Sequence, residues 1–412
     1  MENRARALLQ DMFRAAVAAA DPALCLAAHL PEKPKGRCVV VGAGKAAAAM
    51  AAALESAWPD VELSGTVVTT YGLPPRTLRI KILEAGHPVP DAGSESAARQ
   101  ILSDVRDLTA DDLVIALISG GGSSLMALPA PWISLVDKQA ATKALLASGA
   151  TIAEINVVRK HLSAVKGGRL AKAALPARVV TLAISDVPGD DPATIASGPT
   201  VPDPSTWADV DRICKQHGIF LPVGIIRQET PKPGEFDLDY RVIATPAMAL
   251  RAAAEVARAA GVTPLILGDA IEGEAREMGT VMAGIARSVR TQGLPCAAPC
   301  VLISGGEATV TMHGEQHGKG GPNQEFALAA ALALRGLPDV WLLAGDTDGI
   351  DGNNAAAGAL LGPDFLQREG IFEPEVALRL HDVTRVLAER EALLTTGQTQ
   401  TNVNDFRAVL VL

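Results

Sequence analysis

The sequence predicts an α/β protein with two α/β domains, the first of them built on a Rossmann-like, mostly parallel sheet. Short β-branched runs alternate with alanine-rich helical patterns along the chain, which is typical of βαβ units. A chain of 412 residues is too long for one compact core. A stretch rich in proline and glycine at residues 218–240 interrupts the alternation. We therefore expect an N-terminal domain at 1–235 and a smaller C-terminal domain at 236–412.

The first half of the chain provides the elements of the N-terminal domain. Residues 1–20 spread their charges through an amphipathic pattern, which predicts a first helix. The expected strands are the apolar runs CVVVGAG, SGTVVTT, LRIKILEAG, DDLVIALIS and ARVVTLAIS. Helices are expected after the first strand through Ala57 and then at 94–105, 134–147 and 151–175.

The second half repeats this alternation in the C-terminal domain. Its expected strands include RVIAT, VTPLILGD, PCVLIS and DVWLLAG, and a closing strand ends the chain. The sequence leaves open whether that last strand returns to the N-terminal domain. Sheets of this kind bind ligands beyond the carboxyl ends of their strands. We therefore expect the active site in the cleft between the two domains.

Composition and charge argue against several classes of function. The net charge is −9 and no block of lysines is present, which argues against nucleic acid or an anionic membrane as a partner. The five cysteines form no CxxC pair and are expected to be buried in a reducing cytosol. The sequence has neither the apolar core of a signal peptide nor the roughly 18 uncharged apolar residues of a membrane span. We expect a cytoplasmic protein and leave a homodimer open.

A first glycine turn, GAGK at residues 42–45, follows the first expected strand. Its spacing fits the GxGxxA form of the Rossmann fingerprint, in which backbone amides approach a pyrophosphate. That fingerprint also needs an acidic residue about 20 positions further on, but the second strand ends in the neutral residues 69–71. Lys45 instead places a positive charge at a helix start, where it suits a phosphate or a carboxylate. A tight turn with an exposed lysine would show the same pattern.

A second glycine turn, SGGGSS at residues 119–124, follows another apolar strand. Three glycines between hydroxyl residues make a nest of amides that suits an anion. A flexible turn is the alternative, although three successive glycines lose much conformational entropy on folding. The elbow GxSxG is absent, which argues against a serine nucleophile.

Three carboxylates, those of Asp186, Asp190 and Asp191, follow the strand that ends near residue 184. Oxygen ligands of this kind suit Mg²⁺, which needs only one or two of them when substrate phosphates complete the set. A capped, solvated loop would contain the same residues.

The helical segment 155–171 carries Asn156, Arg159 and Lys166 close to helical spacing. In one interpretation these side chains point into the cleft and hold an anionic substrate. In the other they belong to a solvated basic face. His161 is a candidate base, but a lone histidine more often makes structural hydrogen bonds.

Three loops of the C-terminal half suit ligands. Lys319 and two glycines precede a helix that opens at Pro322, and such a helix start can face an anion. The loop GDTDGIDG at 345–352 lacks the register of a calcium loop and indicates a hydroxyl or metal site. The hydroxyl-rich stretch at 395–406 suits sugar or triphosphate contacts. Ordinary solvated loops are the alternative for the last two.

Glycine turns, a lysine, an acidic loop and the missing ribose acid together indicate phosphoryl transfer, in which a protein mainly positions groups and neutralises charge. Seven ordered motifs also resemble the glycerate 2-kinase family, whose C-terminal part is called MOFRL and whose members often carry the label hydroxypyruvate reductase. The resemblance runs from about residue 5 to residue 407. The motifs are VVGAGKAAAAMA, ISGGGSSL, INVVRKHLSAVKGGRLA, ISDVPGDDPATIASGPTVPD, GGPNQEFALA, AGDTDGIDG and TNVNDF.

The resemblance implies that ATP and Mg²⁺ are used to phosphorylate D-glycerate to 2-phospho-D-glycerate. It also implies a central role for Lys45, and we expect Asp190 to be the second catalytic residue. The expected substrate contacts are Gly44, Ser119, Gly121, Gly122, Ser123 and Arg159. The expected nucleotide contacts are Lys319, Gly320, Gly321, Asn323, Asp346 and Asn402, and the expected metal ligands are Asp186 and Asp191.

The chain departs from the family pattern at two places. Pro322 stands where many members have an arginine, and Lys319 is the candidate replacement. Asp348 adds an acid to a loop in which many members have one fewer. Two other functions compete with this one. The first is an NAD(P)H-dependent hydroxypyruvate reductase, which the missing ribose acid disfavours. The second is a non-catalytic sugar-phosphate sensor, for which no output surface is visible in the sequence.

Overall fold

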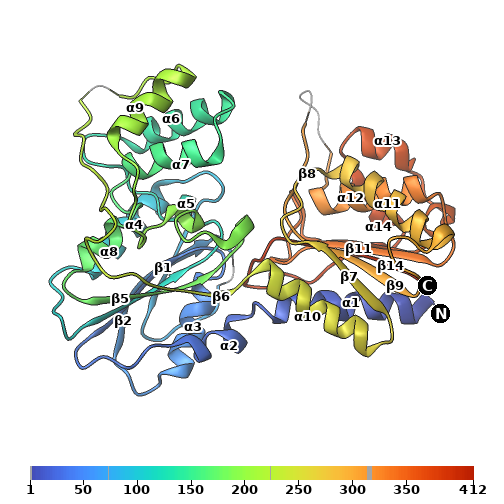
Figure 1. Ribbon diagram of the computed structural model, residues 1–412, viewed down its shortest axis with the longest axis horizontal. Coiled ribbons are helices and arrows are strands. Elements are labelled where there is room, and N and C mark those ends of the chain that lie inside the picture. Colours follow the sequence, from blue (N-terminus) through green and yellow to red (C-terminus); the bar gives the residue numbers. More distant parts are fainter. Residues whose placement is uncertain (1, 73, 223, 313–317) are drawn as a thin grey trace. The chain divides into compact units, whose positions relative to one another are not determined.

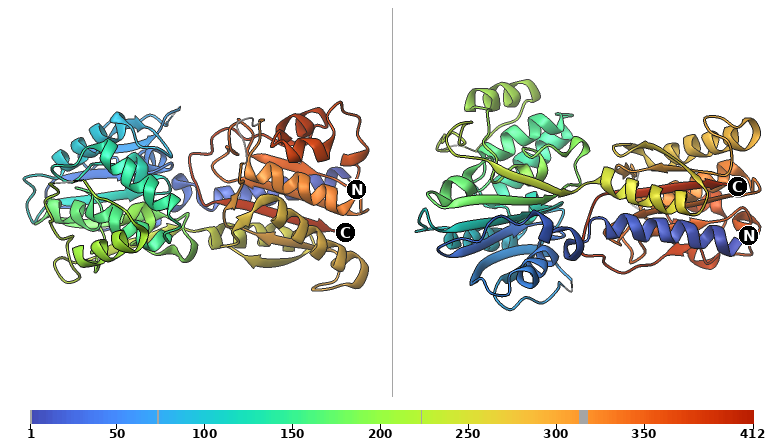
Figure 2. Two further views of the ribbon diagram at one scale, coloured as in Figure 1. Left: turned by 90° about the horizontal axis from the view of Figure 1, so that it is seen from above. Right: turned by 60° about the horizontal axis from the view of Figure 1, so that its bottom comes forward.

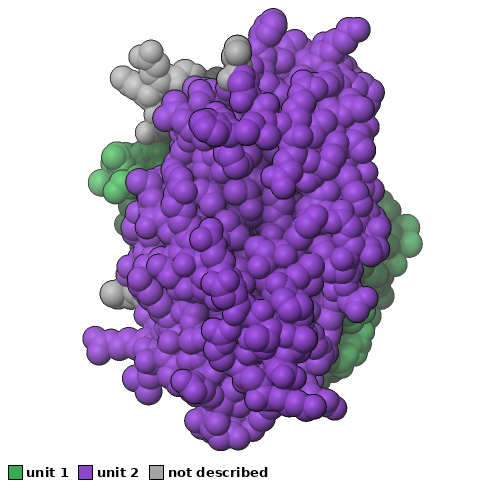
Figure 3. Space-filling model, turned by 90° about the vertical axis from the view of Figure 1, so that its left-hand side faces the viewer, with its two compact units in different colours: residues 1–21, 244–412 green, residues 22–243 purple. Residues whose placement is uncertain are grey.

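A computed structural model describes residues 2–72, 74–222, 224–312 and 318–412 of the chain (Figure 1). The chain forms two compact units. The N-terminal unit contains residues 22–243, and the C-terminal unit contains residues 1–21 together with 244–412 (Figure 3).

The N-terminal unit is built on a six-stranded sheet with the strand order β3-β2-β1-β4-β5-β6. The pairs β3–β2, β2–β1, β1–β4 and β4–β5 are parallel. This is the strand order of the Rossmann fold, so the predicted Rossmann-like sheet is confirmed. The strands are β1 (Cys38–Ala43), β2 (Leu63–Thr70), β3 (Lys81–Ala85), β4 (Leu113–Ile118), β5 (Arg178–Ile184) and β6 (Asp239–Ala244).

Helices cover both faces of this sheet, with α3 on one face and α4 on the other (Figure 1). Because both faces are covered, every residue of β1 and β4 is buried, and both strands are continuous apolar runs. A separate group of α6, α7 and α9 packs through its own apolar cluster. The helices of the unit are α2 (Pro22–Cys25), α3 (Ala47–Ala57), α4 (Ala92–Asp104), α5 (Gly122–Leu125), α6 (Leu135–Ala147), α7 (Ile152–His161), α8 (Arg169–Ala174) and α9 (Trp207–His217).

The prediction of a single helix at 151–175 is wrong, because the structure has two helices there. Gly167 and Gly168 separate α7 from α8 with φ angles of 58° and 80°. Glycine adopts this left-handed conformation readily, whereas a right-handed helix cannot continue through it. The break places Lys166 in the protein interior and not on one face of a long helix.

The C-terminal unit has a mixed sheet with the strand order β13-β12-β11-β14-β9-β7. β11 is antiparallel to both β12 and β14, β14 is antiparallel to β9, and β9 is parallel to β7. The expected C-terminal α/β domain is therefore present. The strands of the unit are β7 (Thr263–Gly268), β8 (Gly273–Glu274), β9 (Cys300–Ser304), β10 (Ala308–Thr309), β11 (Val340–Asp346), β12 (Gly358–Leu361), β13 (Leu393–Leu394) and β14 (Asp405–Val411).

The first helix of the chain belongs to this C-terminal unit. α1 lies beside α10 on one face of the mixed sheet, and α11 and α12 lie on the other (Figures 1 and 2). The Phe13 ring of α1 contacts the Phe406 ring of β14 edge to face, with centroids 5.9 Å apart. The helices are α1 (Glu2–Ala18), α10 (Pro246–Ala259), α11 (Ala275–Gln292), α12 (Pro322–Leu334), α13 (Pro374–Arg379) and α14 (Val383–Glu389).

The two units differ in their bounds from the expected domains 1–235 and 236–412. Residues 1–21 pack with the C-terminal unit because the apolar face of α1 is covered by that unit's sheet and by α10. The second division falls at 243/244, after β6 has completed the parallel sheet. The last strand does not return to the N-terminal unit, since β14 lies between β11 and β9. Within the described part of the chain, no helix combines the length and the apolar character that crossing a membrane requires.

Candidate active site

The first glycine turn packs directly against the second. Gly44 has a φ of 143°, and a Cβ atom at this position would lie 2.1 Å from the Ser119 Oγ. The Lys45 amide donates to the Gly120 carbonyl at 2.8 Å, and the Ala46 amide donates to the Ser119 Oγ at 3.0 Å. The two turns therefore form one structure at the carboxyl ends of β1 and β4.

These hydrogen bonds change the expected role of the first turn. The amides of Gly44, Lys45 and Ala47 donate to backbone carbonyls, and that of Ala46 donates to a side chain. Amides that are already bonded are not open to a phosphate, unlike those of a dinucleotide-binding turn. The group that this turn contributes to a ligand is the half-buried Lys45 side chain.

The second turn has the open amides. In the described part of the chain, no acceptor makes a hydrogen bond with the amides of Gly120 or Gly121. Gly121 has a φ of 77°, and a Cβ atom there would lie 2.9 Å from the His87 Cδ2 and 3.6 Å from the Lys45 Cγ. His87 and Lys45 therefore flank the turn, and glycine is required between them. This arrangement fits the predicted anion nest.

Arg159 and Lys166 meet this turn at Ser123. The Arg159 Nη2 donates to the Ser123 Oγ at 2.6 Å, and the Lys166 Nζ donates to the Ser123 carbonyl at 2.6 Å. Ser123 also shares a hydrogen bond of 3.0 Å with the hydroxyl of Ser197, which in turn donates to the Asn156 Oδ1. The structure thus brings Asn156, Arg159 and Lys166 together inside the unit, not on a solvated face.

The acidic loop does not gather its three carboxylates on one metal position. Across residues 2–72, 74–222, 224–312 and 318–412, no group of three or more His, Cys, Asp or Glu side chains is placed to hold a metal. The Asp191 carboxylate accepts from the Ala193 amide at 3.1 Å and from the Thr194 hydroxyl at 2.6 Å. The Asp190 Oδ1 is buried and has no hydrogen-bond partner in the described structure. Asp190 therefore has one oxygen without a hydrogen bond in the described structure, whereas the Asp191 carboxylate holds the backbone and side chain of the following residues.

The carboxyl end of β2 shows why a dinucleotide site is incomplete. In Rossmann enzymes this position holds the acid that binds the ribose. Here the Thr69 hydroxyl donates to the Lys45 carbonyl at 3.3 Å, and the next residues are Thr70 and Tyr71. The Tyr71 hydroxyl donates to Asp91 at 2.7 Å. Asp91 caps α4 by accepting from the Ser94 amide, so this acid already has a structural task.

In the C-terminal unit, the start of α12 is occupied by the protein's own carboxylate. The Asp351 Oδ1 accepts from the Asn323 amide and the Asp351 Oδ2 from the Gln324 amide, both at 2.9 Å. The amide of Lys319 donates to Asp382 at 2.9 Å, and that of Gly320 donates to Asn353 at 3.0 Å. Burial is the largest cause that raises the pKa of Asp351 to about 7.

The other residues expected to bind nucleotide lie around the junction of β11 and β14. Asp346 pairs with Asp405 across these two strands, and the Asn323 Nδ2 donates to the Asp405 Oδ1 at 2.6 Å. The Asp346 Oδ1 accepts from the Asp348 amide, and the Asn402 Oδ1 accepts from the Asn404 amide. The structure therefore brings Asn323 and Asp346 to one edge of the C-terminal sheet, while Asn402 lies in the loop that leads into β14.

Two further residues of the N-terminal unit were not singled out from the sequence. His87 reaches Gly121 from the loop after β3, and no local pattern marks it. Lys138 lies on α6, is 6% exposed, and its Nζ has no hydrogen-bond partner in the described structure. An isolated lysine in a regular helical pattern looks like a surface residue, so only the fold reveals its burial.

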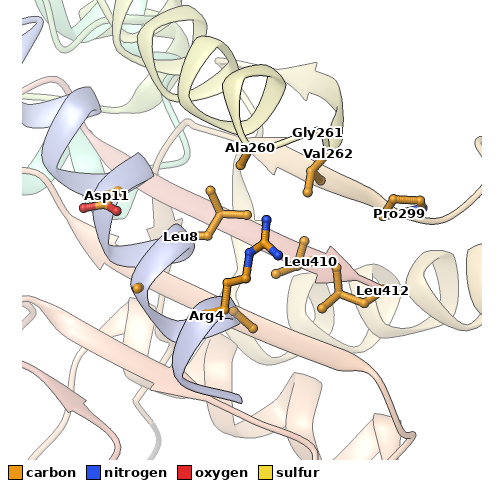
Figure 4. A pocket seen from close by; sticks show the side chains of 11 residues that line it. Arg4, Leu8, Asp11, Ala260, Gly261, Val262, Pro299, Leu410 and Leu412 are labelled. Atoms are coloured by element: carbon orange, nitrogen blue, oxygen red, sulfur yellow. The ribbon is translucent and has the colours of Figure 1, made fainter. Parts of the chain in front are cut away.

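A cavity of about 400 Å³ lies elsewhere, within the C-terminal unit (Figure 4). It is lined mainly by apolar residues of α1, the turn after α10 and the end of β14, with the Arg4 guanidinium among them. None of the predicted site residues lines this cavity.

The geometry defines a class of protein: an α/β protein whose N-terminal unit has the Rossmann strand order but offers a cationic glycine turn in place of a ribose-binding acid. Residues 8–228 match the domain of unknown function DUF4147, and residues 300–405 match the MOFRL family.

Relatives across the whole chain are more specific. The chain is 40% identical to the D-glycerate 2-kinase of Thermotoga maritima, over 98% of this chain and 97% of the relative. The crystal structure of glycerate kinase from the same organism has a TM-score of 0.91 at 38% identity and covers 100% of both chains. A protein of Agrobacterium vitis named "Putative hydroxypyruvate reductase" is 58% identical over 99% of this chain and 94% of its own length. The chain belongs to the MOFRL-type glycerate kinase family, as the motifs had indicated.

Proposed function

We propose that the protein is a glycerate 2-kinase, which uses ATP and Mg²⁺ to convert D-glycerate into 2-phospho-D-glycerate. The observation that carries the proposal is the convergence of Lys45, Arg159 and the open amides of Gly120 and Gly121 on one glycine turn. Relatives named as glycerate 2-kinases at 40% and 42% identity over most of the chain support it. The absence of an acid at residues 69–71 argues against binding of a nicotinamide cofactor.

Positioning and charge neutralisation are the main requirements of phosphoryl transfer to an alcohol. We assign the turn at 119–124, Lys45 and Arg159 to the substrate, because its carboxylate needs a cationic, amide-lined site. We assign Asp190 to the proton of the 2-hydroxyl group. Its buried Oδ1 has no partner in the described structure and can accept that proton during attack on the γ-phosphate.

The acidic loop also has donors that fit Mg²⁺. Carboxylate oxygens are the ligands this ion prefers, and the loop contains two carboxylates besides that of Asp190. We assign Asp186 and Asp191 to the metal, with Asp191 using oxygen lone pairs that its local hydrogen bonds leave over. Bound Mg²⁺ would neutralise charge on the transferred phosphoryl group.

We assign the nucleotide contacts to residues of the C-terminal unit, namely Lys319, Gly320, Gly321, Asn323, Asp346 and Asn402. The amides of Lys319 and Gly320 already donate to Asp382 and Asn353, so the exposed Lys319 side chain is the group we expect to reach a phosphate. This assignment keeps Lys319 as the replacement for the arginine that many relatives have at the position of Pro322.

A two-arm assay on the purified protein tests the proposal. One arm contains D-glycerate, ATP and Mg²⁺, and phosphorus NMR identifies the product. The other contains hydroxypyruvate with NADH or NADPH, and nicotinamide absorbance is followed. We expect 2-phosphoglycerate in the first arm and no nicotinamide oxidation in the second. Oxidation of nicotinamide without phosphoglycerate would establish the reductase instead.

The proposed reaction needs only small-molecule partners, D-glycerate and ATP. Location in the cytoplasm and the lack of a nucleic-acid partner stay predictions from charge and composition. A homodimer also stays open, and size-exclusion chromatography with light scattering would decide it.

A further inference from the structure

The cationic side chains of Arg159 and Lys166 meet at Ser123, and within the described residues no carboxylate forms an ion pair with either of them. A third cation, Lys138, lies buried on the neighbouring helix α6. We propose that Lys138, Arg159 and Lys166 form a preformed pocket for the carboxylate group of the substrate acid, and that Lys138 is its specificity-determining residue. The pocket needs only the N-terminal unit. Its assignment to a 2-hydroxy acid rests on the proposed function, whereas its ability to bind a small carboxylate does not.

Ser123 ties two of the three cations to the glycine turn. Its Oγ lies 2.6 Å from the Arg159 Nη2 and 3.1 Å from the Lys166 Nζ. The Lys166 Nζ also donates to the Ser123 carbonyl at 2.6 Å. The acceptors for both charges are thus neutral oxygens, which do not cancel charge.

The Lys138 ammonium group has fewer hydrogen-bond partners than the charged groups of Arg159 and Lys166. It comes from α6 and is 6% exposed, and its Nζ is buried without a hydrogen-bond partner in the described part of the chain. A buried ammonium without a partner is costly, because burial removes its water and nothing replaces it. A ligand with negative charge would supply what the Lys138 Nζ lacks.

The charge of Arg159 acts on both lysines, and that of Lys138 acts on Lys166. Burial, and then the charge of Arg159, lowers the pKa of Lys138 to about 7. Burial is the largest cause that lowers the pKa of Lys166 well below its usual value, followed by the charges of Lys138 and Arg159. The helix packing agrees with this. Lys138 lies on the face of α6 that packs against α7, the helix of Arg159, because Ala141 and Leu145, three and seven residues further along α6, share an apolar cluster with Val158 of α7.

Neighbouring acids are committed elsewhere. On α6, Asp137 caps the helix by bonding Ser134, and on α7, Glu154 caps the helix by bonding Thr151. The remaining basic residues at the end of α7 face other acids: Lys160 pairs with Asp203 at 3.5 Å, and His161 with Glu229 at 3.4 Å. Within the described residues, none of the three pocket cations forms an ion pair.

The lining suits the carboxylate of a small acid. A planar guanidinium such as that of Arg159 pairs well with a carboxylate, and the two ammonium groups add positive charge. The open amides of Gly120 and Gly121 lie on the same turn as Ser123 and suit the other oxygens of the substrate. A carboxylate held here would place a 2-hydroxyl beside the turn that carries Lys45.

The test compares Lys138→Met with Lys143→Met, a matched control that removes an exposed lysine of the same helix. We expect Lys138→Met to raise the KM for D-glycerate about tenfold or more while kcat changes less than about threefold. Its Tm should be no lower than that of the wild type, because a buried unpaired charge is lost. Lys143→Met should leave KM unchanged. An unchanged KM in a folded Lys138→Met protein overturns the pocket.

Calorimetry on the wild type provides a measurement that needs no variant. D-glycerate should bind, and the neutral analogue glycerol should not. At about pH 8, binding should take up a proton, since a bound carboxylate favours the charged form of Lys138. Repeating the titration in two buffers of different ionisation enthalpy measures that proton. Equal binding of glycerol, or no proton uptake, overturns the proposal.

The pocket and the proposed function can fail separately. If the wild type makes no phosphoglycerate but binds D-glycerate, and Lys138→Met loses this binding, the kinase proposal fails and the pocket stands. If the wild type makes phosphoglycerate and Lys138→Met has the same KM, the pocket alone fails.

Discussion

The turn at 119–124 and the helix start at 319–324 look alike in sequence, since both place glycines before a helix that could face an anion. They differ in what the rest of the fold supplies. Around residues 119–124 the protein gathers buried cations and leaves the amides of Gly120 and Gly121 open. At the helix start at 319–324, the buried carboxylate of Asp351 already accepts hydrogen bonds from the amides of Asn323 and Gln324. A glycine and helix pattern thus marks an anion position, but the anion can be a ligand or a side chain of the protein.

The largest expected effect follows removal of the Lys45 side chain, the cation that flanks the turn at 119–124. Lys45→Ala should lower turnover at least about a hundredfold, because the charge that balances the phosphoryl group or the carboxylate is lost. Folding should change little, since the backbone bonds of the turn remain. Steady-state kinetics and thermal unfolding measure the two effects. Near-normal turnover in Lys45→Ala would remove Lys45 from the mechanism and erase the contrast between the two regions.

A backbone change at the first turn should come next. Gly44→Ala should lower the free energy of unfolding by about 2 kcal/mol, because the new Cβ would meet the Ser119 Oγ and φ is positive. Gly149→Ala is the control, since Gly149 also has a positive φ but nothing lies within 4 Å of its would-be Cβ. Denaturant unfolding of both variants separates the clash from the backbone strain. Equal losses would show that the packing of the two turns contributes nothing.

A smaller effect is expected from the acidic loop. Asp190→Asn should lower kcat about tenfold, since the unused oxygen of Asp190 is assigned to the proton of the substrate hydroxyl. Asp191→Asn should change kcat less, because an amide oxygen can still accept from the Ala193 amide. Its main effect should be a higher Mg²⁺ concentration for half-maximal activity. A larger loss of kcat for Asp191→Asn would exchange the two roles.

The smallest effect concerns the second region and its pH dependence. The pKa of Asp351 is raised to about 7 from an ordinary 3.8, so the folded state binds more protons than the unfolded state between these values. Stability from this group should therefore fall as pH rises from about 4 to about 7.

Asp351→Asn should reduce that slope and cost about 1 kcal/mol at neutral pH, where the carboxylate accepts hydrogen bonds that an amide cannot fully replace. Urea unfolding at several pH values measures both. A wild type and variant with parallel pH profiles would show that Asp351 does not titrate in this range, and that its place at the helix start is purely structural.

Much of the fold could be predicted because strand and helix periods are local properties. The Rossmann-like sheet follows from alternating apolar runs, and β1 and β4 lie where the glycine turns suggested. The affiliation of α1 could not be predicted, since its apolar face identifies a buried helix but not its partner. The break between α7 and α8 was missed although Gly167 and Gly168 mark it, because the basic residues around them continue a helical spacing.

The candidate site divides in the same way. Lys45, Ser123 and Arg159 could be found because glycine turns and basic clusters have recognisable patterns. His87 and Lys138 could not, because each is an isolated residue whose position depends on contacts distant in sequence. The bonding of the Lys45 and Ala46 amides could not be read from the turn itself, because their acceptors, Gly120 and Ser119, follow a strand that pairs with β1 from far along the chain.

The assignment of α1 to the C-terminal unit has a consequence for how the chain acquires its structure during synthesis. Residues 2–18 leave the ribosome long before their partner α10, which begins only at Pro246. The whole N-terminal unit emerges between α1 and α10. It can complete its parallel sheet while α1 still lacks its packing partner. Nascent chains arrested after residues 22–243 have left the ribosome, but before α10 is complete, should thus contain a protease-resistant 22–243 segment behind an unprotected amphipathic helix. That helix would be a target for a chaperone that binds exposed apolar faces.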